Sequence, residues 1–181
     1  MRIGVFCSAN SHIDPEFFTM TEQLGRWAAA ARHQIVFGGV SQGLMECVAR
    51  AAKEGGGATV GVVPSIVEES GRVSAYNDRV VRCDNLSSRK QLMMDESDVF
   101  IALPGGIGTL DEVFTVAASI TIGYHQKRVI LYNMKGFWDS LVRMLDDLQG
   151  RGVIRGQWRD YICVAHTLEQ IKELIIMHYA L

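Results

Sequence analysis

The feature of this sequence that most constrains its fold is a regular alternation of short apolar segments with longer amphipathic ones. Seven segments are short, mostly apolar and rich in β-branched residues, and they span 3–9, 34–39, 58–64, 79–83, 99–104, 128–133 and 161–165. Helical patterns lie between them, at roughly 14–32, 43–54, 86–97, 109–123, 136–150 and 167–179. Apolar strands separated by helices are typical of a parallel sheet that is covered on both faces. The sequence therefore predicts an α/β fold, doubly wound, with a mainly parallel sheet of about seven strands.

Length and composition narrow the class of protein further. The 181 residues fit one domain, 1–181, because domains average about 150 residues. A net charge of −2 gives no reason to expect nucleic acid as a partner. No apolar run is long enough to span a membrane and the first residues do not resemble a signal peptide, so we expect a cytoplasmic protein. The four cysteines form no CxxC pair and the five histidines have no metal-ligand spacing, so we expect reduced thiols and no metal site.

In a doubly wound fold, ligands bind beyond the carboxyl ends of the strands, and the loop after the fifth strand is the richest of these in glycine. It contains Gly105, Gly106 and Gly108, followed by Thr109 at the expected start of a helix. Glycines let backbone amides approach a ligand closely, and a helix N-terminus favours an anion. The alternative is a structural turn in which Thr109 and Glu112 form a capping box. Three glycines exceed what capping requires, so we predict a phosphate-binding loop accompanied by the cap.

A second glycine-rich loop follows the second strand and reads GGVSQGLME from Gly38. Val40 stands where a dinucleotide-binding fingerprint requires glycine, and Leu44-Met45 stand where a Walker P-loop has Lys-Ser. The loop can hold a sugar or a phosphate, with Gly39 as the candidate residue, or it can be a structural turn. We expect no nucleotide cofactor of the NAD or ATP type. The segment 65–78 has the weakest pattern in the chain and can form a short helix followed by an active-site loop.

Two charged residues follow the fourth strand, Arg89 and Lys90, close to the start of the next helix, which Asn85 or Ser87 can cap. A cation near a helix N-terminus opposes the helix dipole, which suggests a functional role such as binding phosphate or orienting Glu112. A solvated charged face is the alternative. Ser8 in the first loop can contact a ligand or simply be a polar loop residue. Cys7 is expected to be a packed thiol, and the eight methionines are expected to fill the core.

These motifs, in this order and spacing, resemble the LOG (LONELY GUY) family of cytokinin riboside 5'-monophosphate phosphoribohydrolases, some of which are labelled possible lysine decarboxylases. The resemblance rests on GGVSQGLMECVARAA and on SRKQLMMDESDVFIALPGGIGTLDEVF, and it spans nearly the whole chain. It implies a Rossmann-like fold and hydrolysis of the N-glycosidic bond of a nucleoside 5'-monophosphate, a small-molecule substrate. It also implies a homodimer with its active sites near the interface. No cofactor is expected, because no motif for pyridoxal phosphate surrounds any lysine.

The resemblance assigns roles residue by residue. Arg89 and Glu112 match the catalytic pair, Lys90 accompanies Arg89, and Gly105, Gly106, Gly108 and Thr109 match the phosphate-binding loop. The chain departs from the usual family pattern around the base. Val40 and Glu46 stand where glycine is usual, Leu86-Ser87 replace a common Met-His pair, and Thr115, Ser119 and Thr121 replace Glu, Trp and Gln. These departures leave the preferred base open.

The expected mechanism places Glu112 beside the anomeric carbon, where it stabilises the developing positive charge and orients or deprotonates water. Arg89 is expected to hold Glu112 ionised and in place, or to grip the phosphate. The helix 109–123 is apolar on several faces, which agrees with a partner protomer but also with burial in a large domain. The main alternative function is a non-catalytic carrier or sensor of a nucleotide or phosphorylated cofactor, which needs the glycines but not the carboxylate.

Overall fold

The computed structural model describes residues 1–179, and all seven strands within them form one parallel sheet. The strands are β1 (Arg2–Phe6), β2 (Gln34–Phe37), β3 (Thr59–Pro64), β4 (Arg79–Cys83), β5 (Val99–Ala102), β6 (Val129–Tyr132) and β7 (Ile162–Ala165). Their order across the sheet is β4-β3-β2-β1-β5-β6-β7, and every neighbouring pair is parallel. The predicted fold class is confirmed.

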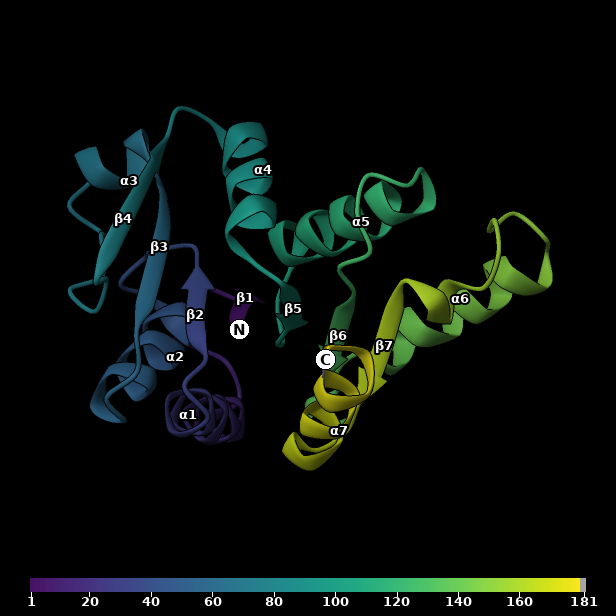
Figure 1. Ribbon diagram of the computed structural model, residues 1–181, viewed down its shortest axis with the longest axis horizontal. Coiled ribbons are helices and arrows are strands. Elements are labelled where there is room, and N and C mark those ends of the chain that lie inside the picture. The colour runs from purple at the N-terminus through teal and green to yellow at the C-terminus, as the bar shows by residue number, and fades with distance from the viewer. Residues whose placement is uncertain (180–181) are drawn as a thin grey trace.

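Helices cover both faces of this sheet. They are α1 (Pro15–Ala30), α2 (Gly43–Glu54), α3 (Ser65–Glu69), α4 (Leu86–Glu96), α5 (Ile107–Thr121), α6 (Asp139–Gly150) and α7 (Leu168–Tyr179), with 3-10 turns at Met134–Gly136 and Trp158–Asp160. One buried cluster joins the sheet to α1, α2 and α7, and a second joins it to α4, α5 and α6. Figure 1 shows α4 and α5 on one side of the strands and α1, α2 and α7 on the other.

The strands β2, β5 and β6 are apolar because each one contributes residues to both buried clusters, whereas the edge strand β4 carries Arg79 and Arg82. In β2, Ile35 and Phe37 face the cluster under α1 and α2, whereas Val36 faces the opposite cluster, and all three are fully buried. Successive side chains of a strand point to opposite faces, so a strand buried on both sides cannot alternate between apolar and polar residues.

Local signals set the helix starts. The Asp14 carboxylate accepts a hydrogen bond from the amide of Glu16 at 2.9 Å and Pro15 occupies the first helical position, so α1 begins where the sequence predicted. Asn85 and Ser88 cap the start of α4 reciprocally, at 2.9 and 3.2 Å. The capping of α4 by Asn85, one of the two predicted caps, is confirmed.

Three local predictions differ from the structure. The first strand ends at Phe6, so residues 7–9 belong to the following loop. Helix α5 begins at Ile107, two residues before its expected start. The segment 65–78 does begin with a short helix, α3, but its loop pairs with the glycine-rich loop after β2, through a bridge between Val40 and Val73.

The strand order creates one crevice. The chain leaves β1 on one side to build β2, β3 and β4, and then returns through α4 to place β5 on the other side of β1. The loops after β1 and β5 therefore diverge, which opens a space at the carboxyl edge of the sheet. None of the helices within residues 1–179 is both long and apolar enough to cross a membrane.

Candidate functional site

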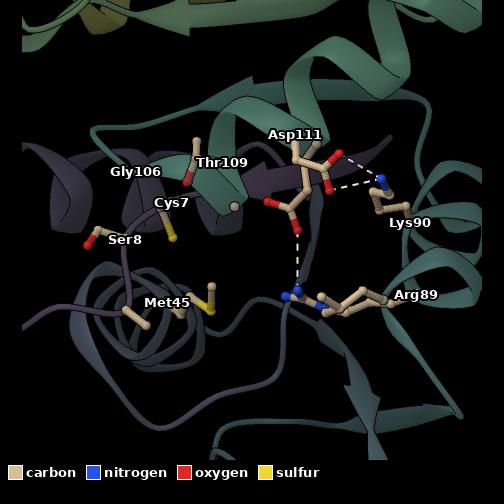
Figure 2. Close-up of a pocket in the computed structure, with 12 residues that line it drawn as sticks. Cys7, Ser8, Met45, Arg89, Lys90, Gly106, Thr109 and Asp111 are labelled. Carbon is tan, nitrogen blue, oxygen red and sulfur yellow. Dashed lines mark hydrogen bonds and ion pairs between the residues drawn. The ribbon is translucent and has the colours of Figure 1, made fainter.

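A pocket of about 240 Å³ occupies this crevice. Its walls come from the loops after β1 and β5 and from the first turns of α2, α4 and α5: Cys7, Ser8, Ala9, Met45, Leu86, Arg89, Lys90, Gly106, Gly108, Thr109, Asp111 and Glu112. In Figure 2, Ser8, Cys7 and Thr109 lie toward one end of the pocket, and Arg89 and Lys90 lie toward the other. Six of the eight predicted site residues thus lie around one cavity.

The N-terminus of α5 opens into this pocket. Gly106 is the N-cap residue, so the amides of Ile107, Gly108 and Thr109 have no partner within the helix. A Cβ atom added to Gly106 or Gly108 would meet nothing within 4 Å. These glycines are therefore not required for packing, and their small size leaves free amides accessible to a ligand. Such an end attracts anions because of the free N–H groups and the helix dipole.

The predicted capping box between Thr109 and Glu112 is wrong. Because α5 begins at Ile107, Thr109 lies inside the first turn, and no side chain caps the helix. Gly105 has a packing role instead, since a Cβ there would lie 2.1 Å from Oγ1 of Thr109. The missing side chain of Gly105 lets the buried Thr109 fold back over the loop. Glu112 is consequently free to take another partner.

That partner is Arg89. Nη1 of Arg89 lies 3.4 Å from Oε1 of Glu112, and the two side chains are only 14% and 7% exposed. Nε of Arg89 also donates to the carbonyl oxygen of Val62 on β3 at 3.4 Å. The guanidinium thus lies between the sheet edge and α5, and the ion pair joins α4 to α5 inside the pocket.

Burial sets the protonation of Glu112. The loss of hydration raises the pKa of this carboxyl from 4.5 to about 7, while the charges of Arg89 and Lys90 lower it and that of Asp111 raises it. Burial outweighs the neighbouring cations, so Arg89 does not keep Glu112 fully ionised, contrary to our expectation. A carboxyl with a pKa near 7 exchanges a proton readily at neutral pH, which is the property of a general acid or base.

A second ion pair lies beside the first. Nζ of Lys90 is 2.8 Å from both carboxylate oxygens of Asp111, and Figure 2 shows the two side chains meeting at the edge of the pocket. Asp111 is 52% exposed. As expected for successive helical residues, Asp111 and Glu112 bind different partners. The neighbouring pairs place two cations and two carboxylates around one cavity.

Apolar and thiol groups form the rest of the wall. Met45 and Leu86 line it, and Met45 also packs against the core, as expected of the methionines. For Met45, a signal was its place two residues after Gly43, on the first turn of a helix that starts at the ligand edge. Cys7 is buried, as predicted, and burial raises the pKa of its thiol well above the ordinary value. This thiol stays protonated and is a poor nucleophile.

Gly39 lies outside the lining of the pocket. Its φ is +68°, and a Cβ atom there would lie 2.4 Å from Cγ2 of Val63. Its carbonyl oxygen accepts a hydrogen bond from the amide of Ser74 at 2.8 Å. Residues 65–78 support this turn and do not line the pocket, so the expectation of an active-site loop there is wrong. Within residues 1–179, no three His, Cys, Asp or Glu side chains are grouped so that they could hold a metal ion.

Known proteins resemble this chain over most of its length. A family model described as possible lysine decarboxylase matches residues 45–175. The cytokinin riboside 5'-monophosphate phosphoribohydrolase LOG7 of Arabidopsis thaliana is 34% identical over 177 residues, which cover 94% of this chain and 78% of the relative. The probable phosphoribohydrolase LOGL9 of Oryza sativa subsp. japonica is 36% identical over 176 residues, covering 93% and 78%.

Solved structures share the whole architecture. The structural-genomics target TM1055 is 26% identical, with a TM-score of 0.77 and coverage of 97% of this chain and 98% of the other. The molybdenum cofactor binding protein of Rippkaea orientalis is 25% identical, with a TM-score of 0.73 and coverage of 97% and 95%. The proteins that this chain resembles thus include sequence relatives named as enzymes and a solved structure named for binding. By the family model and the curated relatives together, this chain belongs to the LOG family, the family of the cytokinin riboside 5'-monophosphate phosphoribohydrolases.

Proposed function

We propose that this protein hydrolyses the N-glycosidic bond of a purine or cytokinin nucleoside 5'-monophosphate, releasing the free base and ribose 5-phosphate. The observation that carries the proposal is the buried Arg89–Glu112 pair in the same pocket as the open N-terminus of α5. A binding protein needs only the anion site. A buried carboxyl with a pKa of about 7 is costly to maintain and is typical of catalytic residues.

In this proposal the 5'-phosphate binds the free amides of Ile107, Gly108 and Thr109. Gly106 leaves space for its oxygens, and Gly39 and Gly105 support the loops rather than touch the substrate. Lys90 adds positive charge at the rim while paired with Asp111. Fixing the phosphate places the ribose against Glu112, so binding energy from the phosphate is used to orient the reacting carbon.

Bond cleavage then proceeds through an oxocarbenium-like transition state. The C1'–N bond breaks and its electron pair leaves with the base, while the oxygen of a water molecule bonds to C1'. Ionised Glu112 stabilises the positive charge and accepts a proton from that water. The base takes one proton from solvent at its nitrogen, and Glu112 then releases to solvent the proton that it accepted, so the sum is one water consumed for one base and one ribose 5-phosphate formed. Arg89 orients the carboxylate through its contact with Oε1.

We also propose that the protein is a cytoplasmic homodimer, with the site near the interface. Two exposed apolar side chains support the dimer: Phe114 on α5 is 36% exposed, and Ile122, which follows the end of this helix, is 62% exposed. An apolar groove of about 420 Å³ runs beside it, lined by α5, α6 and residues 153–162. A second copy of the same helix would cover this surface.

The test is release of free base, followed by chromatography, from AMP and from isopentenyladenosine monophosphate. We expect release by the native chain, loss of at least 100-fold in Glu112→Gln, and little reaction with the corresponding nucleosides. Glu112→Gln keeps the shape of the side chain and should still bind AMP. Equal release by the native chain and Glu112→Gln would refute the role of the carboxylate.

A second candidate function is a non-catalytic carrier of a phosphorylated ligand. The similarity to the molybdenum cofactor binding protein supports it, because the two folds match over nearly their full lengths. Tight binding of AMP, measured by calorimetry, without base release from any monophosphate would favour the carrier.

A further inference from the structure

The space beside Gly38, the residue after β2, is filled by another residue's side chain. A Cβ atom added to Gly38 would lie 2.0 Å from Nη2 of Arg89 and 3.2 Å from its Cζ. Real Cβ atoms essentially never lie within 3.0 Å of such atoms. Gly38 is not among the residues with positive φ, so its backbone conformation does not require glycine. The need for glycine at this position comes from Arg89.

The guanidinium can move aside only by giving up its contacts in the pocket. Its Nε donates to the carbonyl oxygen of Val62, and its Nη1 faces Glu112 at 3.4 Å. Sδ of Met45 lies 3.0 Å from the same added Cβ, so it borders the space that Gly38 leaves open. A side chain at position 38 would therefore push the guanidinium away from its present contacts.

The neighbouring glycine has a different role. At Gly39, φ is +68° and an added Cβ would overlap Val63, so a substitution there strains the backbone and the packing of β3. At Gly38, the nearest atom is the far end of a flexible side chain, which can move at small cost to the fold. Substitutions at the two adjacent glycines should thus have different effects. A substitution of Gly39 should lower the stability of the fold, and a substitution of Gly38 should change the site.

We propose that Gly38 is a positioning residue, whose missing side chain provides the space in which Arg89 holds Glu112. The inference rests on the proposed function for its effect on catalysis, but its effect on Glu112 is independent of any reaction. Displacing Arg89 removes a positive charge from beside the carboxyl, so the pKa of Glu112 should rise above about 7.

The experiment compares Gly38→Ala with Gly150→Ala, an exposed glycine at the end of α6 where an added Cβ meets nothing within 4 Å. We expect Gly38→Ala to keep its melting temperature within a few degrees and to raise the pKa of Glu112, measured by carboxyl-carbon NMR. Base release from AMP should fall at least tenfold, mainly in kcat, and its pH profile should shift upward. Gly150→Ala should match the native chain in all of these.

A double-mutant cycle separates positioning from a general packing effect. In an Arg89→Ala background, Gly38→Ala should cause no further loss of base release and no further shift of the pKa, because the displaced atoms are gone. An unchanged pKa of Glu112 in Gly38→Ala, or the same effect with and without Arg89, would overturn the inference. Loss of folding in Gly38→Ala would also overturn it. If the native chain released no base, the proposed function would fail while the pKa comparison still tested Gly38.

Discussion

Replacing Glu112 by Gln should make the protein more stable than the native chain at high pH, although it removes the proposed activity. The carboxyl is buried and its pKa is raised from 4.5 to about 7. At a pH between these two pKa values, Glu112 holds a proton in the native protein but has lost it in the unfolded chain. Stability is therefore lost as the pH rises through this window and is constant above it. Glutamine is neutral at every pH and mimics the protonated form.

The magnitude follows from the shift. At about 1.4 kcal/mol per pKa unit, ionising Glu112 in the folded protein costs about 3 kcal/mol at pH 8 and less than about 1 kcal/mol at pH 5. We expect the Glu112→Gln variant to gain stability relative to the native chain as the pH rises. The difference between their free energies of unfolding should increase by about 2 to 3 kcal/mol from pH 5 to pH 8. For a chain of this size, that is about 5 to 10 °C in melting temperature.

Urea denaturation at pH 5 and pH 8, on both proteins, measures this difference and cancels the titration of all other groups. Glu169→Gln is a useful control, because Glu169 is 74% exposed on α7 and does not line the pocket, so its difference from the native chain should stay the same at the two pH values. A constant difference between Glu112→Gln and the native chain at the two pH values would refute the conclusion that burial dominates the protonation of Glu112.

Three further predictions concern the anion site, the catalytic proton and the assembly. Gly108→Asp should raise the KM for AMP at least tenfold, because a carboxylate there repels the phosphate. The fold should keep its stability, because a carboxylate is favourable in the first turn of a helix. Steady-state kinetics measures the KM, and a melting curve measures the stability. kcat/KM should rise about tenfold per pH unit below about 7 and level off above it, as Glu112 ionises, and a profile that falls across this range would contradict its role as a base. Ala118→Arg, in the apolar groove beside α5, should convert a dimer into a monomer in sedimentation velocity, and an unchanged dimer would show that this groove is not the interface.

The sheet was predictable because its signals are local and agree with one another. The inner strands are nearly continuous in apolar character, and caps such as Asp14 mark the helix starts. The start of α5 was misplaced for the same reason. Thr109 and Glu112 have the spacing of a capping box, and local pattern could not reveal that Glu112 is held by a residue from another helix.

The sequence predicted most of the residues that lie around the pocket but not the contacts that each of them makes. Motifs identified Arg89, Lys90 and the glycine loop, and parallel strands bring such loops to one edge. Which glycine makes room for which side chain depends on distances across the crevice. Gly105 leaves space for Thr109, Gly38 leaves space for Arg89, and Gly106 faces open space. The sequence shows only a glycine at each position and does not distinguish these roles.

Helix α5 fixes the distance between the free amides and Glu112 in the pocket. Its free amides begin at Ile107 and its acidic group sits five residues later, at Glu112, a rise of about 7.5 Å along a rigid rod. A ligand whose anionic end binds the amides at the start of α5 reaches Glu112 only if its own length matches this distance. Moving the phosphate from the 5' to the 3' oxygen changes that span without changing the charge, so under the proposed function we expect the length of this helix to select among nucleoside monophosphates.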